Sequence, residues 1–225
     1  MLNLFGGRKL GLVGLDISAS AIKLLELSGG DGGYVVESYG VEPLPENTVV
    51  EQNIVDVAAV AEAIKRLQAS TQFKSKAAAV AVAGSAVITK TIEVPASLKE
   101  NQIEEQLLMD ADQYIPYPLD EVALDFQVLE ATARSEDMVD VLIAACRQEH
   151  IESRQAALEL SGLTPEVIDI EAHCVQRAIA LDLELFTRDP ALGVPDVLAI
   201  LDIGADMTTL SVVSGSQVLY TREQS

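Results

Sequence analysis

The chain has 225 residues, of which 49% are hydrophobic and 22% are charged, a composition typical of a globular protein with one large domain or two small ones. A formal charge of −20 would repel nucleic acid and anionic lipid surfaces, so neither is an expected partner. The sequence contains no apolar run of about 18 residues that would predict a membrane span, and its two cysteines are typical of a reducing compartment.

The N-terminal third predicts a three-stranded meander covered by a helix. Apolar runs at 12–17 and 21–27 flank a Ser-Ala-Ser turn, and the glycine-rich stretch 29–33 leads into a third strand at 34–39. From 54 to 67 the apolar residues recur at helical spacing, which predicts the covering helix.

The middle third predicts four more strands and one helix. The helix is expected over 97–114, with Ile103, Leu107 and Met109 facing inward. Two prolines force the segment 115–118 to be extended, because proline cannot donate a backbone hydrogen bond. The strands are expected at 77–83, 87–94, 122–129 and 138–146.

The last third predicts two helices and two groups of strands. Together with the preceding elements, this order indicates an α/β fold. The strand at 197–203 is nearly all apolar, and no helix follows to cover it, so we expect an open apolar face and a marginally stable segment at 196–225. The helices are expected at 148–160 and 172–185, the strands at 167–170, 197–203, 208–213 and 217–221, and a connector at 187–195.

One short motif occurs twice. Leu15-Asp16-Ile17-Ser18-Ala19-Ser20 recurs as Leu201-Asp202-Ile203-Gly204-Ala205-Asp206. Each copy ends a hydrophobic strand, and two further strands follow it in both places. The shared frame of strand, turn, strand, turn and strand indicates an internal repeat rather than a chance match.

The repeated turn has the chemistry of a phosphate-binding loop. Successive backbone N–H groups form an anion-binding concavity, small side chains permit close approach, and a carboxylate at the strand end can hold hydrated Mg²⁺. Two such turns facing each other would hold a nucleotide's phosphates. The alternative is that Asp16 and Asp202 only satisfy amides of their own turns.

These motifs resemble the phosphate loops of the actin, sugar kinase and chaperone ATPase superfamily. A more specific likeness is carried by four segments, most of all in the middle third of the chain: Ala111-Asp112-Gln113-Tyr114-Ile115-Pro116-Tyr117-Pro118-Leu119-Asp120-Glu121-Val122, Leu124-Asp125-Phe126, Val80-Ala81-Val82-Ala83-Gly84 and Val167-Ile168-Asp169-Ile170-Glu171. In these segments the chain resembles the PilM family of type IV pilus assembly proteins, which belongs to this superfamily.

The resemblance implies an α/β, actin-like (ribonuclease H-like) lobe with an inserted α+β subdomain and an incomplete second lobe. The first lobe would comprise residues 1–81 and 170–190, the inserted subdomain residues 82–169, and the start of the second lobe residues 196–225.

The resemblance also implies ATP with Mg²⁺ between the two lobes. Asp16 and Asp202 would be the metal ligands, and Lys23 would contact a phosphate. Ser18 stands where the family has glycine, and a positive φ there would cost about 1–2 kcal/mol. The cofactor-binding residues would be Asp16, Ser18, Ala19, Ser20, Lys23, Asp202, Gly204, Ala205 and Asp206.

The implied function is that of a cytoplasmic scaffold in the inner-membrane platform of the type IV pilus, which drives twitching motility. The N-terminal tail of a PilN-like membrane protein would bind between the first lobe and the inserted subdomain and hold the chain at the membrane. Other platform proteins are expected partners, and an oligomer is left open. At most weak ATPase activity is expected, with no catalytic residue identified. The alternatives are an ATP-hydrolysing enzyme and an FtsA-like division protein.

Two further segments of the sequence each allow two interpretations. The segment Tyr114–Pro118 is either a rigid corner of the fold or an edge on which a peptide docks. The acidic residues between 100 and 112 form either a solvated helix face or a surface that attracts a basic peptide.

Overall fold

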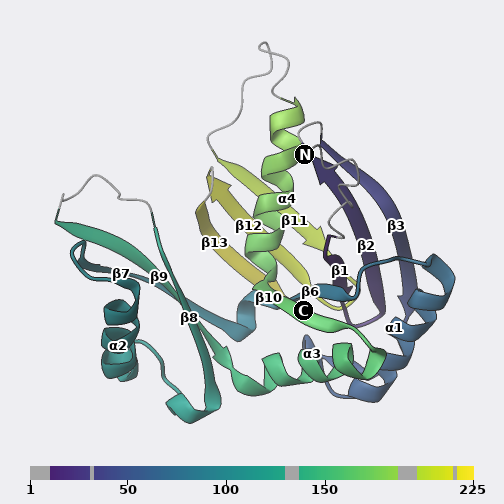
Figure 1. Ribbon diagram of the computed structural model, residues 1–225, viewed down its shortest axis with the longest axis horizontal. Helices are drawn as coiled ribbons and strands as arrows, with labels where there is room; N and C mark the ends of the chain where they lie inside the picture. The colour runs from purple at the N-terminus through teal and green to yellow at the C-terminus, as the bar shows by residue number, and fades with distance from the viewer. Residues whose placement is uncertain (1–10, 31–32, 130–136, 187–196, 215–216) are drawn as a thin grey trace, which may run out of the picture. The chain divides into compact units, whose positions relative to one another are not determined.

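The computed structural model describes residues 11–30, 33–129, 137–186, 197–214 and 217–225, in which strands and helices are mixed throughout the chain (Figure 1). The α/β class expected from the sequence is confirmed. The connector expected at 187–195 lies outside the described residues. Among the helices that the structure describes, none has the length and apolar character needed to cross a membrane.

The main sheet has five strands in the order β10-β6-β1-β2-β3. The meander consists of β1 (Val13–Ile17), β2 (Ala21–Gly30) and β3 (Gly33–Pro43), which pair antiparallel. β6 (Ala77–Val82) pairs parallel with β1, and β10 (Thr164–Ile170) pairs parallel with β6. The carboxyl ends of β1, β6 and β10 therefore meet at one edge of the sheet.

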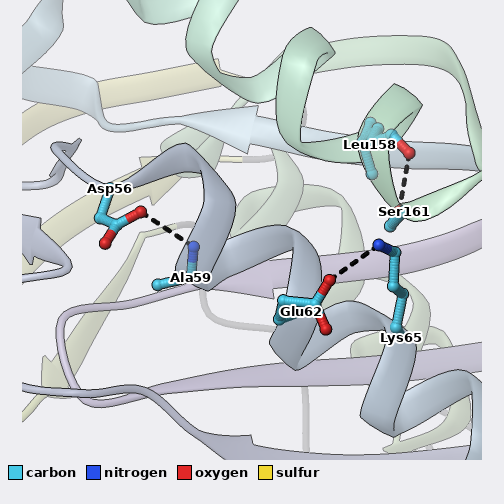
Figure 2. Close-up of polar contacts among 6 residues, drawn as sticks. All are labelled: Asp56, Ala59, Glu62, Lys65, Leu158 and Ser161. Carbon is cyan, nitrogen blue, oxygen red and sulfur yellow. Dashed lines mark hydrogen bonds and ion pairs between the residues drawn. The ribbon is translucent and has the colours of Figure 1, made fainter.

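One face of this sheet is covered by α1 (Val57–Thr71), which follows a short hairpin of β4 (Val49–Val50) and β5 (Asn53–Ile54). The Asp56 carboxylate caps α1 by accepting a hydrogen bond from the Ala59 N–H at 2.9 Å (Figure 2). Apolar side chains three and four residues apart form the buried stripe of the helix, as its sequence period predicts. These residues are Val60, Ile64 and Leu67.

Two more helices flank the strand β10. α3 (Gln148–Ser161) contributes the fully buried Leu158 to the same core as α1, and its end is closed by a hydrogen bond from the Ser161 hydroxyl to the Leu158 carbonyl (2.7 Å; Figure 2). Gly162 then adopts φ +82°, a conformation that favours glycine after a helix. α4 (Glu171–Phe186) starts directly after β10 and packs against β6, β10 and β13.

The middle of the chain forms a second three-stranded antiparallel sheet in the order β7-β9-β8. Its strands are β7 (Val87–Pro95), β8 (Val122–Val128) and β9 (Met138–Arg147). Short 3-10 turns lie at Gly84–Ala86, Ala111–Gln113 and Leu119–Glu121.

Helix α2 (Glu100–Asp110) packs on this sheet through Ile103 and Leu107, which are both 2% exposed. The prediction that Met109 faces inward is wrong, because its side chain is 83% exposed. Two residues beyond Leu107, a helix has turned by about 200°, which carries Met109 to the opposite face.

The C-terminal sheet consists of β11 (Leu198–Ile203), β12 (Thr208–Ser214) and β13 (Gln217–Gln224), in that order. α4 packs against it through β13. Among the described residues, β11 exposes two apolar side chains, with Leu201 60% and Ile203 74% exposed, in agreement with the open apolar face expected for this segment.

The chain divides into two compact units, residues 83–152 and the rest. The sequence places the boundaries of the inserted subdomain at 82 and 169. The second boundary differs from this division, because β10 pairs with β6 in the main sheet and residues 153–161 of α3 belong to the same unit as that sheet.

Candidate functional site

The two copies of the repeated motif form hairpins with the same register. Asp16 is paired with Lys23 across the first hairpin, and Asp202 is paired with Thr209 across the second, seven residues on in both. A backbone hydrogen bond closes each turn, from the Ser18 N–H to the Ala21 carbonyl (3.0 Å) and from the Gly204 N–H to the Met207 carbonyl (2.9 Å). The likeness between the two motifs therefore extends from sequence to strand pairing and turn closure.

Neither turn needs the backbone strain considered for Ser18. Neither Ser18 nor Gly204 has a positive φ. Instead, the Ser18 hydroxyl donates a second hydrogen bond to the Ala21 carbonyl at 2.8 Å. Gly204 is required for space, since a Cβ there would lie 2.8 Å from the Met207 carbonyl oxygen. Serine is thus accommodated in the first turn, and glycine is favoured in the second.

The Asp16 carboxylate forms an ion pair with Lys23, with 2.8 Å between Oδ2 and Nζ. This hydrogen bond and the charge of Asp16 raise the pKa of the Lys23 ammonium, and the charges of Asp202 and Glu171 raise it further. The Asp16 carboxylate therefore accepts its hydrogen bond from a lysine across the hairpin and not from an amide of its own turn. Both side chains are about half exposed, so the pair is accessible to a ligand.

Glu171 is a functional candidate that the sequence analysis did not identify. It is the first residue of α4 and follows the end of β10, at the sheet edge where β1 also ends. Burial, followed by the charge of Asp16, raises the pKa of the Glu171 carboxyl to about 7, and Glu223 and Asp202 act in the same direction. Arg154 opposes this shift. The signal that could have found Glu171 is an acidic residue directly after a strand of a parallel pair.

The negative charges of Asp16 and Asp202 each raise the pKa of both Lys23 and Glu171. The structure therefore brings Asp16, Lys23 and Asp202 into the surroundings of Glu171. The remaining predicted residues lie in the two turns beside these aspartates. Ser20, Gly204, Ala205 and Asp206 are exposed there, and Ser18 and Ala19 are partly buried.

Arg154 is a buried cation, 2% exposed, that braces this region from α3. Its Nε donates to the Ala81 carbonyl (2.8 Å) at the end of β6, and its Nη2 donates to the Gln52 carbonyl (3.1 Å) in the β4–β5 turn. Gln52 and its neighbour Glu51 both have positive φ, so the guanidinium holds a turn of unusual conformation.

The chemistry of the site fits a polyphosphate that carries Mg²⁺ better than it fits a free polyphosphate. Carboxylates outnumber cations around it, so a bare anion would be repelled. No group of three or more potential ligand residues with metal-binding geometry occurs in the described part of the chain. Mg²⁺ commonly uses only one or two carboxylates and keeps its waters, a role open to Asp16 and Asp202. Lys23 would contact a phosphate.

The cysteine and histidine side chains do not form a second candidate centre. Burial, followed by the charge of Asp169, raises the pKa of the Cys174 thiol to about 11, which disfavours the nucleophilic thiolate. Burial lowers the pKa of His173. Cys146 is buried in the sheet of the middle unit.

The segment Tyr114–Pro118 is held within its own unit. Ile115 is 4% exposed, the Lys90 ammonium lies 4.7 Å from the centre of the Tyr114 ring, and the Arg147 guanidinium lies 4.9 Å from that of Tyr117. These contacts support a rigid corner. The Tyr117 side chain is still 37% exposed, which keeps a surface for a peptide.

Residues 14–225 match the family model described as type IV pilus assembly protein PilM. A solved structure of a PilM-PilN type IV pilus biogenesis complex contains a chain that is 32% identical, with a TM-score of 0.76. The match covers 94% of the present chain and 60% of that chain, so the present chain spans less than two thirds of its relative.

Other solved structures are more distant. The ethanolamine utilization protein EutJ from Carboxydothermus hydrogenoformans is 14% identical, with a TM-score of 0.47, over 95% of this chain and 51% of its own. A Bacteroides thetaiotaomicron protein with an actin-like ATPase fold is 11% identical, with a TM-score of 0.42, over 100% of this chain and 73% of its own. The match to the chain of the pilus complex confirms the fold class implied by the resemblance to the PilM family.

Proposed function

Because this chain belongs to the PilM family of type IV pilus assembly proteins, we propose that it is a scaffold of the pilus assembly platform whose partner is the N-terminal tail of a PilN-like membrane protein. The observation that carries the proposal is the 32% identity and TM-score of 0.76 to a chain of a PilM-PilN complex. On this proposal the chain is cytoplasmic and reaches the inner membrane through its partner, with which other platform proteins also assemble.

The charge of the chain supports a basic, partly apolar tail as its ligand. The formal charge of −20 attracts a cationic peptide at long range. Helix α2 adds a local surface, where the exposed apolar side chains of Leu108 and Met109 lie one helical turn from Glu104 and Glu105. A peptide with lysine or arginine beside apolar residues would be complementary to this surface.

Binding of a fluorescent peptide with the sequence of a PilN-like tail tests the proposal by anisotropy. We expect saturable binding that weakens as salt is raised. Glu104→Lys with Glu105→Lys should slow association, whereas the matched pair of changes Glu152→Lys and Glu159→Lys at exposed positions of α3 should have a smaller effect. No binding of the peptide at low salt would refute the proposed partner.

We further propose that ATP with Mg²⁺ binds between the two hairpins as a structural ligand. Three observations support this proposal: the two hairpins share one register, Asp16 forms an ion pair with Lys23, and the charge of Asp202 raises the pKa of that lysine. Calorimetric titration with Mg-ATP tests it. Asp16→Ala should weaken binding, and the absence of any heat of binding in the unsubstituted chain would refute it.

A further inference from the structure

The strand β3 forms an outer edge of the main sheet. It is the last strand in the order of this sheet, and among the described strands it pairs only with β2 (Figure 1). In an antiparallel pair, every second residue of the outer strand turns its N–H and C=O away from its neighbour, so this strand of 11 residues offers a row of backbone donors and acceptors to a further strand. Soluble proteins commonly protect such an edge with lysine or proline, and β3 contains neither before Pro43.

A bulge in β3 gathers its apolar side chains on one face of the sheet. Leu25 of β2 pairs with Tyr39, and Leu27 pairs with Val36, so β3 has one extra residue between these two pairs. Leu25 and Leu27 are two residues apart and share a face, and the extra residue therefore keeps Val36 and Tyr39 on that face as well. Gly40 points toward α1, since a Cβ there would lie 2.5 Å from a side-chain atom of that helix, so the shared face is the one away from α1. The exposed side chains of β3 on this face are Tyr34 (65%), Val36 (56%), Tyr39 (73%) and Val41 (59%).

We propose that β3 pairs antiparallel with β3 of a second copy of the chain, so that the two main sheets join in a symmetric dimer. In the register whose two-fold axis passes between positions 37 and 38, Tyr34 of one copy lies opposite Val41 of the other, and Val36 lies opposite Tyr39. All four cross-strand pairs on this face then join an aromatic residue to a β-branched residue, a favourable combination in antiparallel sheets. The two bulges lie opposite each other in this register, so they do not disturb the pairing on either side.

The charges of β3 also suit a second copy. The strand carries two carboxylates, Glu37 and Glu42, which in this register face Ser38 and Gly33, so no carboxylate lies directly opposite another. Glu42 is also paired with Arg66 of α1, and the Glu37 carboxylate accepts a hydrogen bond from a serine of β2. The edge therefore lacks the excess of negative charge that would favour a basic peptide over a second copy.

The exposed surface is large enough for a weak dimer. A fully covered tyrosine side chain buries about 150–250 Å², so the two tyrosines of β3 expose roughly 250 Å² on each copy. Three valines of β3 are each more than half exposed as well. Together with the backbone of both strands, these side chains approach the roughly 1,000 Å² that a specific interface requires. We therefore expect a dimer whose population depends on protein concentration.

Sedimentation equilibrium of the unsubstituted chain from about 1 to 200 μM tests the proposal. We expect the mass to rise from the 24.0 kDa of one chain to twice that value and no further, because a two-fold contact closes on itself. Higher salt should strengthen the dimer, since it screens the repulsion between two chains of charge −20. In hydrogen exchange, amides of β3 should become more protected as the concentration rises, whereas those of β13, an edge strand of the C-terminal sheet, should not change.

A pair of matched substitutions locates the contact. Tyr39→Glu places a carboxylate in the apolar strip of both copies and should raise the dissociation constant of the dimer at least about tenfold. The control Tyr220→Glu makes the same change at a side chain of β13 that is 50% exposed, and it should leave the dissociation constant within about twofold.

A chain that stays monomeric at the highest concentration would overturn the proposal. Species larger than a dimer, or a dimer that added salt dissociates, would do the same. A dimer weakened by Tyr220→Glu and not by Tyr39→Glu would place the contact on the C-terminal sheet and also overturn it. If circular dichroism shows that Tyr39→Glu is unfolded, hydrogen exchange of the unsubstituted chain decides, and β3 amides with the same protection at all concentrations would refute the pairing.

Discussion

Replacing Glu171 by glutamine should make the folded chain more stable at neutral and alkaline pH. Folding raises the pKa of this carboxyl from 4.5 to about 7, chiefly through burial. Above pH 7 the folded protein must therefore hold a charge that the unfolded chain holds in water at lower cost. At about 1.4 kcal/mol for each pKa unit, the full difference is about 3 kcal/mol.

The direction of the pH dependence follows from proton binding. Between pH 4.5 and about 7 the folded state binds more protons at Glu171 than the unfolded state, so this group's stabilising contribution is complete below pH 4.5 and falls as the pH rises through that range. Glutamine resembles the protonated carboxyl and removes the loss. We expect a gain of roughly 2–3 kcal/mol at pH 8 and almost none at pH 4.

Urea unfolding followed by circular dichroism at both pH values measures this difference. The control Glu159→Gln, at an exposed site, should change stability by less than about 0.5 kcal/mol at either pH. An equal effect of Glu171→Gln at pH 4 and pH 8, or a loss at pH 8, would refute the description of Glu171 as a partly buried carboxyl among like charges.

Three further predictions concern the supports of the site. Arg154→Met should cost about 2–4 kcal/mol in urea unfolding, because it removes the donors to the Ala81 and Gln52 carbonyls; a loss below about 1 kcal/mol would contradict the bracing role. Gly204→Ala should lower the melting temperature more than Ser18→Ala, because the methyl group added at position 204 would lie 2.8 Å from the Met207 carbonyl oxygen, whereas Ser18→Ala adds no atom. In hydrogen exchange, amides of β11–β13 should exchange faster than those of β1–β3; equal protection would show that the open face does not weaken the C-terminal sheet.

The sequence was most informative where structure is local. Six residues around Asp16 and six around Asp202 predict matching hairpins, and the observed register agrees because a tight turn sets the pairing of its own strands. The stripe of α1 is predicted equally well, since the side chains that it buries follow the helical period.

The missed features depend on contacts between distant segments. Glu171 is one of 35 acidic residues, and only the pairing of β10 with β6, about 90 residues earlier in the chain, places it near Asp16. The same pairing moves the boundary expected at 169, because the local pattern of β10 does not show which sheet it joins. Met109 was misplaced for a simpler reason, since an apolar residue at a helix end need not lie on the buried stripe.

The central claim is that the two hairpins hold one ligand together, and a double-mutant cycle measures this directly. Mg-ATP affinity would be determined by calorimetry for the unsubstituted chain, Asp16→Ala, Asp202→Ala and the double variant. A shared site predicts that each single change weakens binding and that their effects are not additive, with a coupling of about 0.5 kcal/mol or more. Additive effects, or an Asp202→Ala variant with unchanged affinity, would contradict the claim.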